Sequence, residues 1–148
     1  MRTQNWLMVL TFFCGMATAS ADFTLERAES DFAGKHYVCV ITISCLTNAP
    51  EWDPEKTPPP LSSRKAIKLA ESAVCTQLGN HPQMPIIYPA WHGFKVALIR
   101  SGKPFGKELW YYRVEVHPVV TGSNSYPPVT VFVTMNGKVM PLTEQKTP

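Results

Sequence analysis

The sequence has few charges and almost no excess of either sign. Charged residues make up 17% of the 148 residues, and 14 Lys and Arg against 11 Asp and Glu leave a net charge of +3. That excess is too small to predict nucleic acid or an anionic membrane surface as a partner. The chain also lacks a Cys-x-x-Cys pair, a glycine-rich phosphate loop and a second apolar run of membrane length. These absences argue against a dithiol redox motif, a nucleotide cradle and a membrane span beyond the N-terminus.

The N-terminal residues have the pattern of a secretion signal. Arg2 precedes an apolar run at 6–16, and small residues follow, with Ala19 and Ala21 at the positions that an A-x-A cleavage site requires. The run is too short and too weakly flanked for a good membrane span. We therefore expect residues 1–21 to be a signal peptide, residues 22–148 to form a single domain, and the protein to be exported, either periplasmic or secreted.

Three cysteines remain after that segment, namely Cys39, Cys45 and Cys75. An odd number permits at most one internal disulfide. Cys39 and Cys45 lie in one extended run, where six residues span about 20 Å, so they are not expected to pair with each other. Two alternatives stay open: a disulfide from Cys75 to Cys39 or Cys45, or three buried thiols that act as small apolar residues.

The periodicity of the chain predicts an α+β fold. A polar lead-in with helical character at 22–35 precedes a strand at 37–46, a proline-rich loop and a helix at 63–78 capped by Ser62 or Ser63. Strands are expected at 94–100, 109–116 and 129–135, and a return strand at 138–142 follows a type I′ turn at Asn136-Gly137. The economical arrangement is one main helix packed on a curved antiparallel sheet of four to five strands.

Residues 61–142 resemble the PepSY domain family of small exported domains. The resemblance rests on the helix opening Leu61-Ser62-Ser63-Arg64-Lys65-Ala66-Ile67-Lys68-Leu69-Ala70, the strand Trp110-Tyr111-Tyr112-Arg113-Val114-Glu115-Val116, and the close Val129-Thr130-Val131-Phe132-Val133-Thr134-Met135-Asn136-Gly137-Lys138-Val139. The more general cystatin-like arrangement of one helix held in a curved sheet fits equally well. The resemblance implies regulation or inhibition of peptidases, and it carries over no catalytic residues.

The aromatic residues give the main indication of a binding surface. Trp91 and Phe105 lie in loops, and Tyr111 alternates away from Trp110 and Tyr112, so the pattern predicts that Tyr111 is exposed. Exposed aromatic residues on loops and edges can anchor a protein partner. Packing of the same residues onto neighbouring loops is the alternative.

No catalytic, cofactor or metal site is predicted. None of the three cysteines is placed where its thiol would be activated, and the four histidines lack metal-ligand spacing. We expect a non-catalytic exported binding module that regulates or inhibits an envelope or secreted enzyme and whose partner is another exported protein. The first alternative is a structural or accessory subunit of an envelope assembly. The second is an enzyme without a recognisable motif, which would require a polar pocket around His81, His92 and Cys75.

Overall fold

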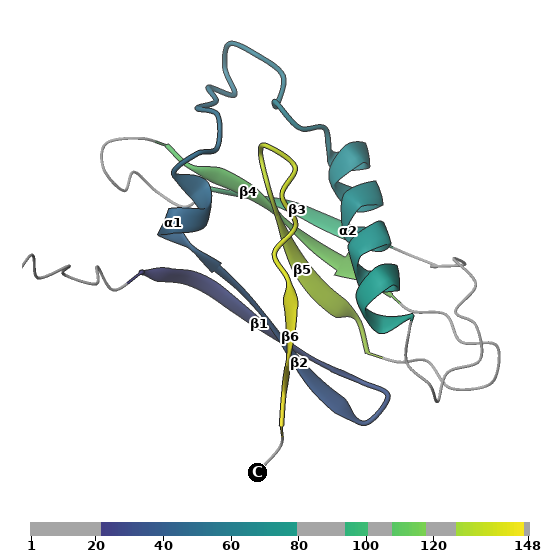
Figure 1. Cartoon of the computed structure of the whole chain (residues 1–148). Coiled ribbons are helices and arrows are strands. Elements are labelled where there is room, and N and C mark those ends of the chain that lie inside the picture. The colour runs from purple at the N-terminus through teal and green to yellow at the C-terminus, as the bar shows by residue number, and fades with distance from the viewer. Residues whose placement is uncertain (1–21, 80–93, 101–107, 118–126, 147–148) are drawn as a thin grey trace, which may run out of the picture.

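The structure is a computed structural model that describes residues 22–79, 94–100, 108–117 and 127–146, with the backbone alone at 94–99. Its elements in chain order are β1 (Thr24–Phe32), β2 (Lys35–Thr42), α1 (Ile43–Leu46), α2 (Ser63–Leu78), β3 (Phe94–Arg100), β4 (Trp110–Val116), β5 (Val129–Thr134) and β6 (Leu142–Gln145). The fold is therefore α+β with more strand than helix, as the sequence predicts (Figure 1).

The strands form two antiparallel sheets of three strands each, not one curved sheet of four to five. The first sheet has the order β1-β2-β6, and the second has the order β3-β4-β5. The predicted single sheet is wrong because the chain crosses from one sheet to the other after β5. Val139 makes an isolated bridge to Val133 of β5, and the N–H of Met140 donates to the carbonyl of Phe132. The chain then leaves that edge and pairs with β2 as β6 from Leu142 onward. The return strand predicted at 138–142 thus becomes a crossing segment.

The lead-in predicted at 22–35 with helical character is instead strand β1 and its turn. Ala28, Ser30 and Phe32 are buried and alternate with exposed charged residues, which is the period of a half-buried strand. Alanine and serine give a weak strand signal, so the alternation is hard to recognise in the sequence. The turn at Ala33-Gly34 has φ values of 53° and 74°, as a type I′ hairpin requires.

Helix α2 occupies the predicted residues. The side chain of Ser62 accepts a hydrogen bond from the backbone N–H of Lys65 at 3.3 Å, which identifies Ser62 as the N-cap. Its buried face consists of Ala66, Ala70, Val74 and Leu78. This face packs on β4 and β5, because the small alanines allow the helix axis to approach the sheet closely.

The turn after β5 differs from the predicted type I′ turn. Only Gly137 has a positive φ, at 85°, while Asn136 does not. The N–H of Gly137 donates to the carbonyl of Thr134 at 2.8 Å, and the N–H of Thr134 donates to the carbonyl of Lys138 at 2.9 Å. This is a three-residue loop with glycine in the left-handed position, one of the common alternatives to the two-residue turn.

The second sheet is the middle layer of the molecule. The hydroxyl of Tyr112 donates to the carbonyl of Leu61 just before α2, so the face of β4 that carries Tyr112 points toward the helix. The neighbouring residues Tyr111 and Arg113 both bond to Glu26 of β1. Figure 1 accordingly shows α2 and the β1–β2 hairpin on opposite sides of the second sheet. Every residue of β5 is buried because both of its faces are covered.

Strand β2 ends earlier than the sequence predicts, and this changes the placement of the cysteines. Ile43–Leu46 form the short helix α1, so Cys45 does not continue the extended run of Cys39. The distance of about 20 Å inferred for an extended chain therefore does not apply. None of Cys39, Cys45 and Cys75 forms a disulfide in the structure.

Candidate functional site

The predicted anchors do not form one surface in the described residues. Trp91 and Phe105 lie outside them, as do His81 and His92 of the enzyme alternative. Tyr111 is 3% exposed, so its predicted exposure is wrong. The prediction assumed that one face of β4 meets solvent, whereas the first sheet covers that face.

Tyr111 belongs to a polar cluster between the two sheets. Its hydroxyl donates to Glu26 Oε2 at 2.8 Å, and Arg113 donates to Glu26 Oε1 at 3.0 Å. Burial raises the pKa of Tyr111 far above its usual value, and the hydrogen bond to Glu26 raises it further. The hydrogen bond between Tyr111 and Glu26 therefore holds β1 against β4. Because the phenol stays protonated, Tyr111 is not suited to act as a general acid or base.

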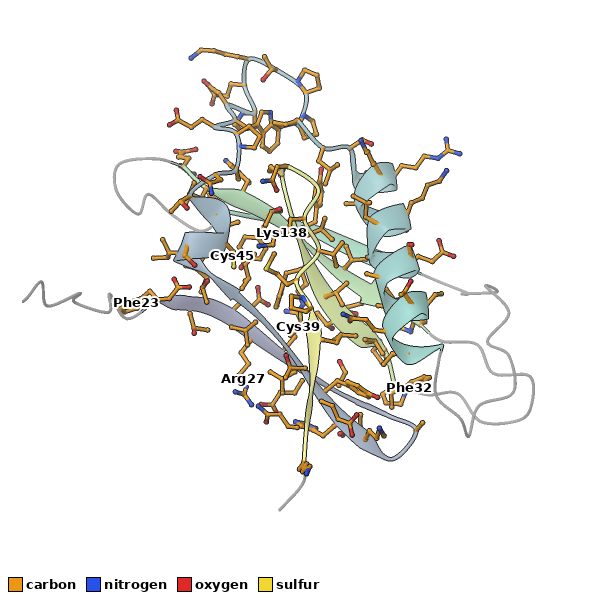
Figure 2. The ribbon with its side chains drawn as sticks, in the orientation of Figure 1. Phe23, Arg27, Phe32, Cys39, Cys45 and Lys138 are labelled. Carbon is orange, nitrogen blue, oxygen red and sulfur yellow. The ribbon has the colours of Figure 1, made fainter. Side chains whose placement is uncertain are left out.

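The predicted disulfide from Cys75 to Cys39 or Cys45 is not formed in the structure. The thiol of Cys39 points to the carbonyl of Met140, with 3.6 Å between Sγ and O. Cys45 Sγ lies 3.2 Å from the hydroxyl of Thr42. Figure 2 shows Cys39 on β2 and Cys45 on α1. Cys75 is on α2, which packs on the other sheet, so the single sheet that would have brought strand and helix cysteines together does not exist.

A hollow of about 540 Å³ lies where the loop before α2 meets the ends of β3 and β4. It is lined by Glu51, Trp52, Asp53, Pro54, Glu55, Arg100, Glu108 and Trp110. Four carboxylates and one guanidinium therefore surround it, so the lining is negative although the whole chain is positive. Such a lining favours a cationic ligand over an anionic one.

The hollow is built on a pair of tryptophans. The rings of Trp52 and Trp110 are 5.1 Å apart between centroids and meet edge to face at 65°. Trp52 is almost fully buried, and its indole N–H donates to the carbonyl of Thr57 at 2.7 Å, which closes the loop on itself. The aromatic pair holds the loop against the first residue of β4 and gives the hollow an apolar floor.

The loop itself is ordered by Asp53. Its carboxylate accepts the N–H of Glu55 at 3.1 Å and pairs with Lys56 at 2.7 Å. The hydrogen bond from Lys56 lowers the pKa of Asp53, and the same bond raises the pKa of Lys56. Asp53 is therefore occupied in holding the loop, which leaves the exposed Glu55 better placed to meet a ligand.

The other wall is the hairpin of β3 and β4. Arg100 is the partner of Trp110 in the strand register, pairs with the carboxylate of Glu108, and lies 5.9 Å from the centroid of the Trp110 ring. A guanidinium already stacks on this indole, which shows that the ring face is suited to a cation. Within the described part of the chain, the buried indole N–H of Trp110 has no hydrogen-bond partner.

Sequence reasoning missed most of this hollow. The acidic residues at 51, 53 and 55 suggest only a solvated loop beside prolines, and Trp52, Arg100 and Glu108 do not stand out. A tryptophan flanked on both sides by acids in a proline-rich loop is the signal that was available. Among the described residues, no group of three His, Cys, Asp or Glu side chains converges to hold a metal ion.

The chain matches no protein-family model, no curated protein and no solved structure. No helix within the described ranges is long and apolar enough to cross a membrane. The interpretation of the site therefore rests on its own geometry.

Proposed function

We propose that the protein is a non-catalytic exported binding module whose acidic, tryptophan-floored hollow receives a basic side chain of another exported protein. The hollow carries this proposal, because its lining has four carboxylates against one guanidinium and includes two tryptophans. Asp53 pairs with Lys56 and Glu108 with Arg100, so the exposed Glu55 is the acid that we expect to meet the ligand. Cation–aromatic contact and carboxylate pairing together favour arginine or lysine. The signal-like residues 1–21 support export. Regulation of a secreted or envelope enzyme is the role that this proposal favours.

Titration with a tetra-arginine peptide tests the hollow directly. Trp52 and Trp110 line it, so we expect a saturable change in tryptophan emission with this peptide and none with a tetra-glutamate peptide. The Glu55→Lys variant reverses an exposed charge at the hollow and should abolish the change. Glu71→Lys on α2 is the matched control, because it makes the same charge change away from the hollow and should bind normally.

The identity of a partner is tested by crosslinking in exported fractions. The wild-type protein and the Glu71→Lys control should capture the same abundant partner, while Glu55→Lys should lose it. An emission change that persists in Glu55→Lys would contradict the assignment of the hollow. Equal capture by all three proteins would move the partner surface elsewhere on the molecule.

We also propose a distant relation to the PepSY family. Its support is the order of elements: a serine-capped helix, a tyrosine-bearing strand, and strand β5, which ends in a glycine turn. The first sheet and the crossing segment before β6 are additions to that pattern.

A role as a structural or accessory subunit is the second candidate. The open edge of β1 favours it, because a free strand edge is a surface for assembly.

A further inference from the structure

Strand β1 forms an open edge of the first sheet. A strand inside a sheet pairs with a neighbour on each side, but β1 pairs only with β2, along residues Thr24–Phe32. The opposite edge strand, β6, has four residues, and the free edge of β5 is partly occupied because Met140 donates to the carbonyl of Phe132. Among the edges whose side chains the structure describes, β1 is thus the longest that lacks a second partner. Its nine residues are enough to template another strand.

The hairpin turn determines which backbone groups of β1 face outward. Phe32 and Lys35 flank a two-residue turn and form a hydrogen-bonded pair, so alternate residues toward the N-terminus bond to β2. Ser30 and Ala28 belong to that inward set. The N–H and C=O groups of Arg27, Glu29 and Asp31 consequently point away from β2 and have no strand to pair with among the described residues.

The side chains of these outward residues carry one positive charge, at Arg27, and two negative charges, at Glu29 and Asp31. Arg27, Glu29 and Asp31 are all exposed, and Figure 2 labels Arg27 on β1. The Arg27 guanidinium also donates to the side chain of Gln145 on β6 at 3.3 Å, so it lies over the exposed face of the first sheet. Arg27 and Glu29 contact each other within the strand at 2.9 Å, with 47% and 53% of their side chains exposed. Both therefore remain accessible to a second chain.

We propose that two copies of this chain associate by pairing their β1 edges antiparallel, with Ala28 of one copy opposite Ala28 of the other. In this register the outward backbone groups of Arg27 bond to those of Glu29 in the second copy, and those of Glu29 bond to Arg27 of the second copy. The two first sheets then become one continuous six-stranded sheet across a two-fold axis, an isologous interface. The small side chain of Ala28 leaves room for close approach at the centre.

Charge selects this register over its neighbours. Moving the axis to Arg27 places two arginines opposite each other, and moving it to Glu29 does the same for two glutamates. The axis at Glu29 also brings Arg27 opposite Asp31 of the second copy, but it keeps the two facing glutamates. Only the axis at Ala28 gives two opposite-charge pairs and no like-charge pair among the three outward residues. Opposite charges stabilise directly facing cross-strand positions, and like charges destabilise them.

The pairing is expected to be short and sensitive to salt. The register of β1 against β2 shifts between Thr24 and Glu26, so a regular partner strand extends only over the part of β1 after this bulge. Exposed charge pairs are screened as the ionic strength rises. The association should therefore weaken in high salt.

Charge reversal in separate and mixed samples tests the proposal. The protein is recovered from the exported fraction of an expressing culture, and its mass is measured by light scattering over a concentration series at low salt. Wild type should dimerise. Arg27→Glu alone and Glu29→Arg alone should each raise the dimer dissociation constant at least about tenfold, because two attractive pairs become repulsive. An equimolar mixture of the two variants should dimerise again, since the opposite charges then face each other.

The mixture separates a folding defect from a register effect, because a misfolded variant would not be rescued by its counterpart. The double variant Arg27→Glu/Glu29→Arg should also dimerise. A wild-type protein that stays monomeric at every concentration would overturn the proposal. So would dimers that withstand both single reversals, or single variants that fail to recover on mixing.

Discussion

At the scale of single residues, burial decides what the polar side chains of this protein can do. Tyr111 sits on the face of β4 that alternation assigns to solvent, yet its hydroxyl bonds to Glu26 between the sheets. Tyr111 and Arg113 both donate hydrogen bonds to the carboxylate of Glu26. These bonds compensate for the water that Glu26 loses where the two sheets pack together. A residue that the sequence offers as a binding anchor is thereby a structural contact.

Cys39 provides a prediction at this scale. Burial raises the pKa of its thiol from 9.0 to about 11. Below pH 9 the thiol is protonated in both the folded and the unfolded chain, so the free energy of unfolding has its full value. Above pH 9 the unfolded chain loses this proton while the folded chain keeps it, which favours unfolding. The free energy of unfolding should then fall by about 2 kcal/mol as the pH rises from 9 to 11.

The comparison for this prediction is the Cys39→Ala variant, measured by chemical denaturation across the same pH range. The tyrosines titrate in both proteins, so their effect cancels in the difference. The variant should lose less stability than wild type between pH 9 and 11. Parallel pH profiles for the two proteins would show that the thiol does not titrate as its burial requires.

At the scale of elements, turns and caps fix where each strand and helix begins and ends. Helix α2 has its serine cap, and the hairpin after β5 has glycine at its left-handed position. The β1–β2 turn is different, because Ala33 adopts φ 53° where an L-residue with a Cβ is disfavoured. That strain is local and can be relieved by one substitution.

We predict that Ala33→Asn stabilises the protein by about 0.5–1 kcal/mol, since asparagine tolerates this conformation and Asn-Gly is the preferred type I′ pair. Thermal or denaturant unfolding measures the gain. The matched control is Gly34→Ala, which should destabilise the protein. No atom lies within 4 Å of the added methyl group, so the loss would come from backbone strain at a φ of 74° and not from a steric clash. A loss of stability in Ala33→Asn would contradict the assigned turn.

At the scale of the whole molecule, stability depends on a middle sheet covered on both faces. Phe132 is 0% exposed, and its ring meets that of Tyr111 edge to face with 5.8 Å between centroids. Helix α2 also contacts β5, and every residue of β5 is buried. The core is consequently one cluster to which both sheets and α2 contribute.

Phe132→Ala should lower the free energy of unfolding by about 3–5 kcal/mol, because it opens a cavity between the two sheets. Denaturant unfolding followed by far-UV circular dichroism measures this loss. Phe132→Leu keeps most of the volume and should lose clearly less. If both variants unfolded like wild type, the first sheet would not pack on β5 as described.

The sequence by itself determined the elements whose signals are local. Alternation located β3, β4 and β5, the apolar stripe with Ser62 located α2, and these residues alone predicted an α+β fold. Each signal depends on neighbours within a few positions, so the chain alone carries it. The weak alternation of Ala28, Ser30 and Phe32 in β1 lies at the limit of this approach.

Only the tertiary structure decided how those elements are grouped. The crossing of 138–142 between sheets made two sheets from one predicted sheet and buried Tyr111, and the predicted disulfide of Cys75 is not formed. The hollow joins Trp52 to Trp110, which are far apart in the sequence. Which face of a strand is covered depends on segments brought in from elsewhere in the chain. No local period encodes that covering, because burial is a property of the assembled layers.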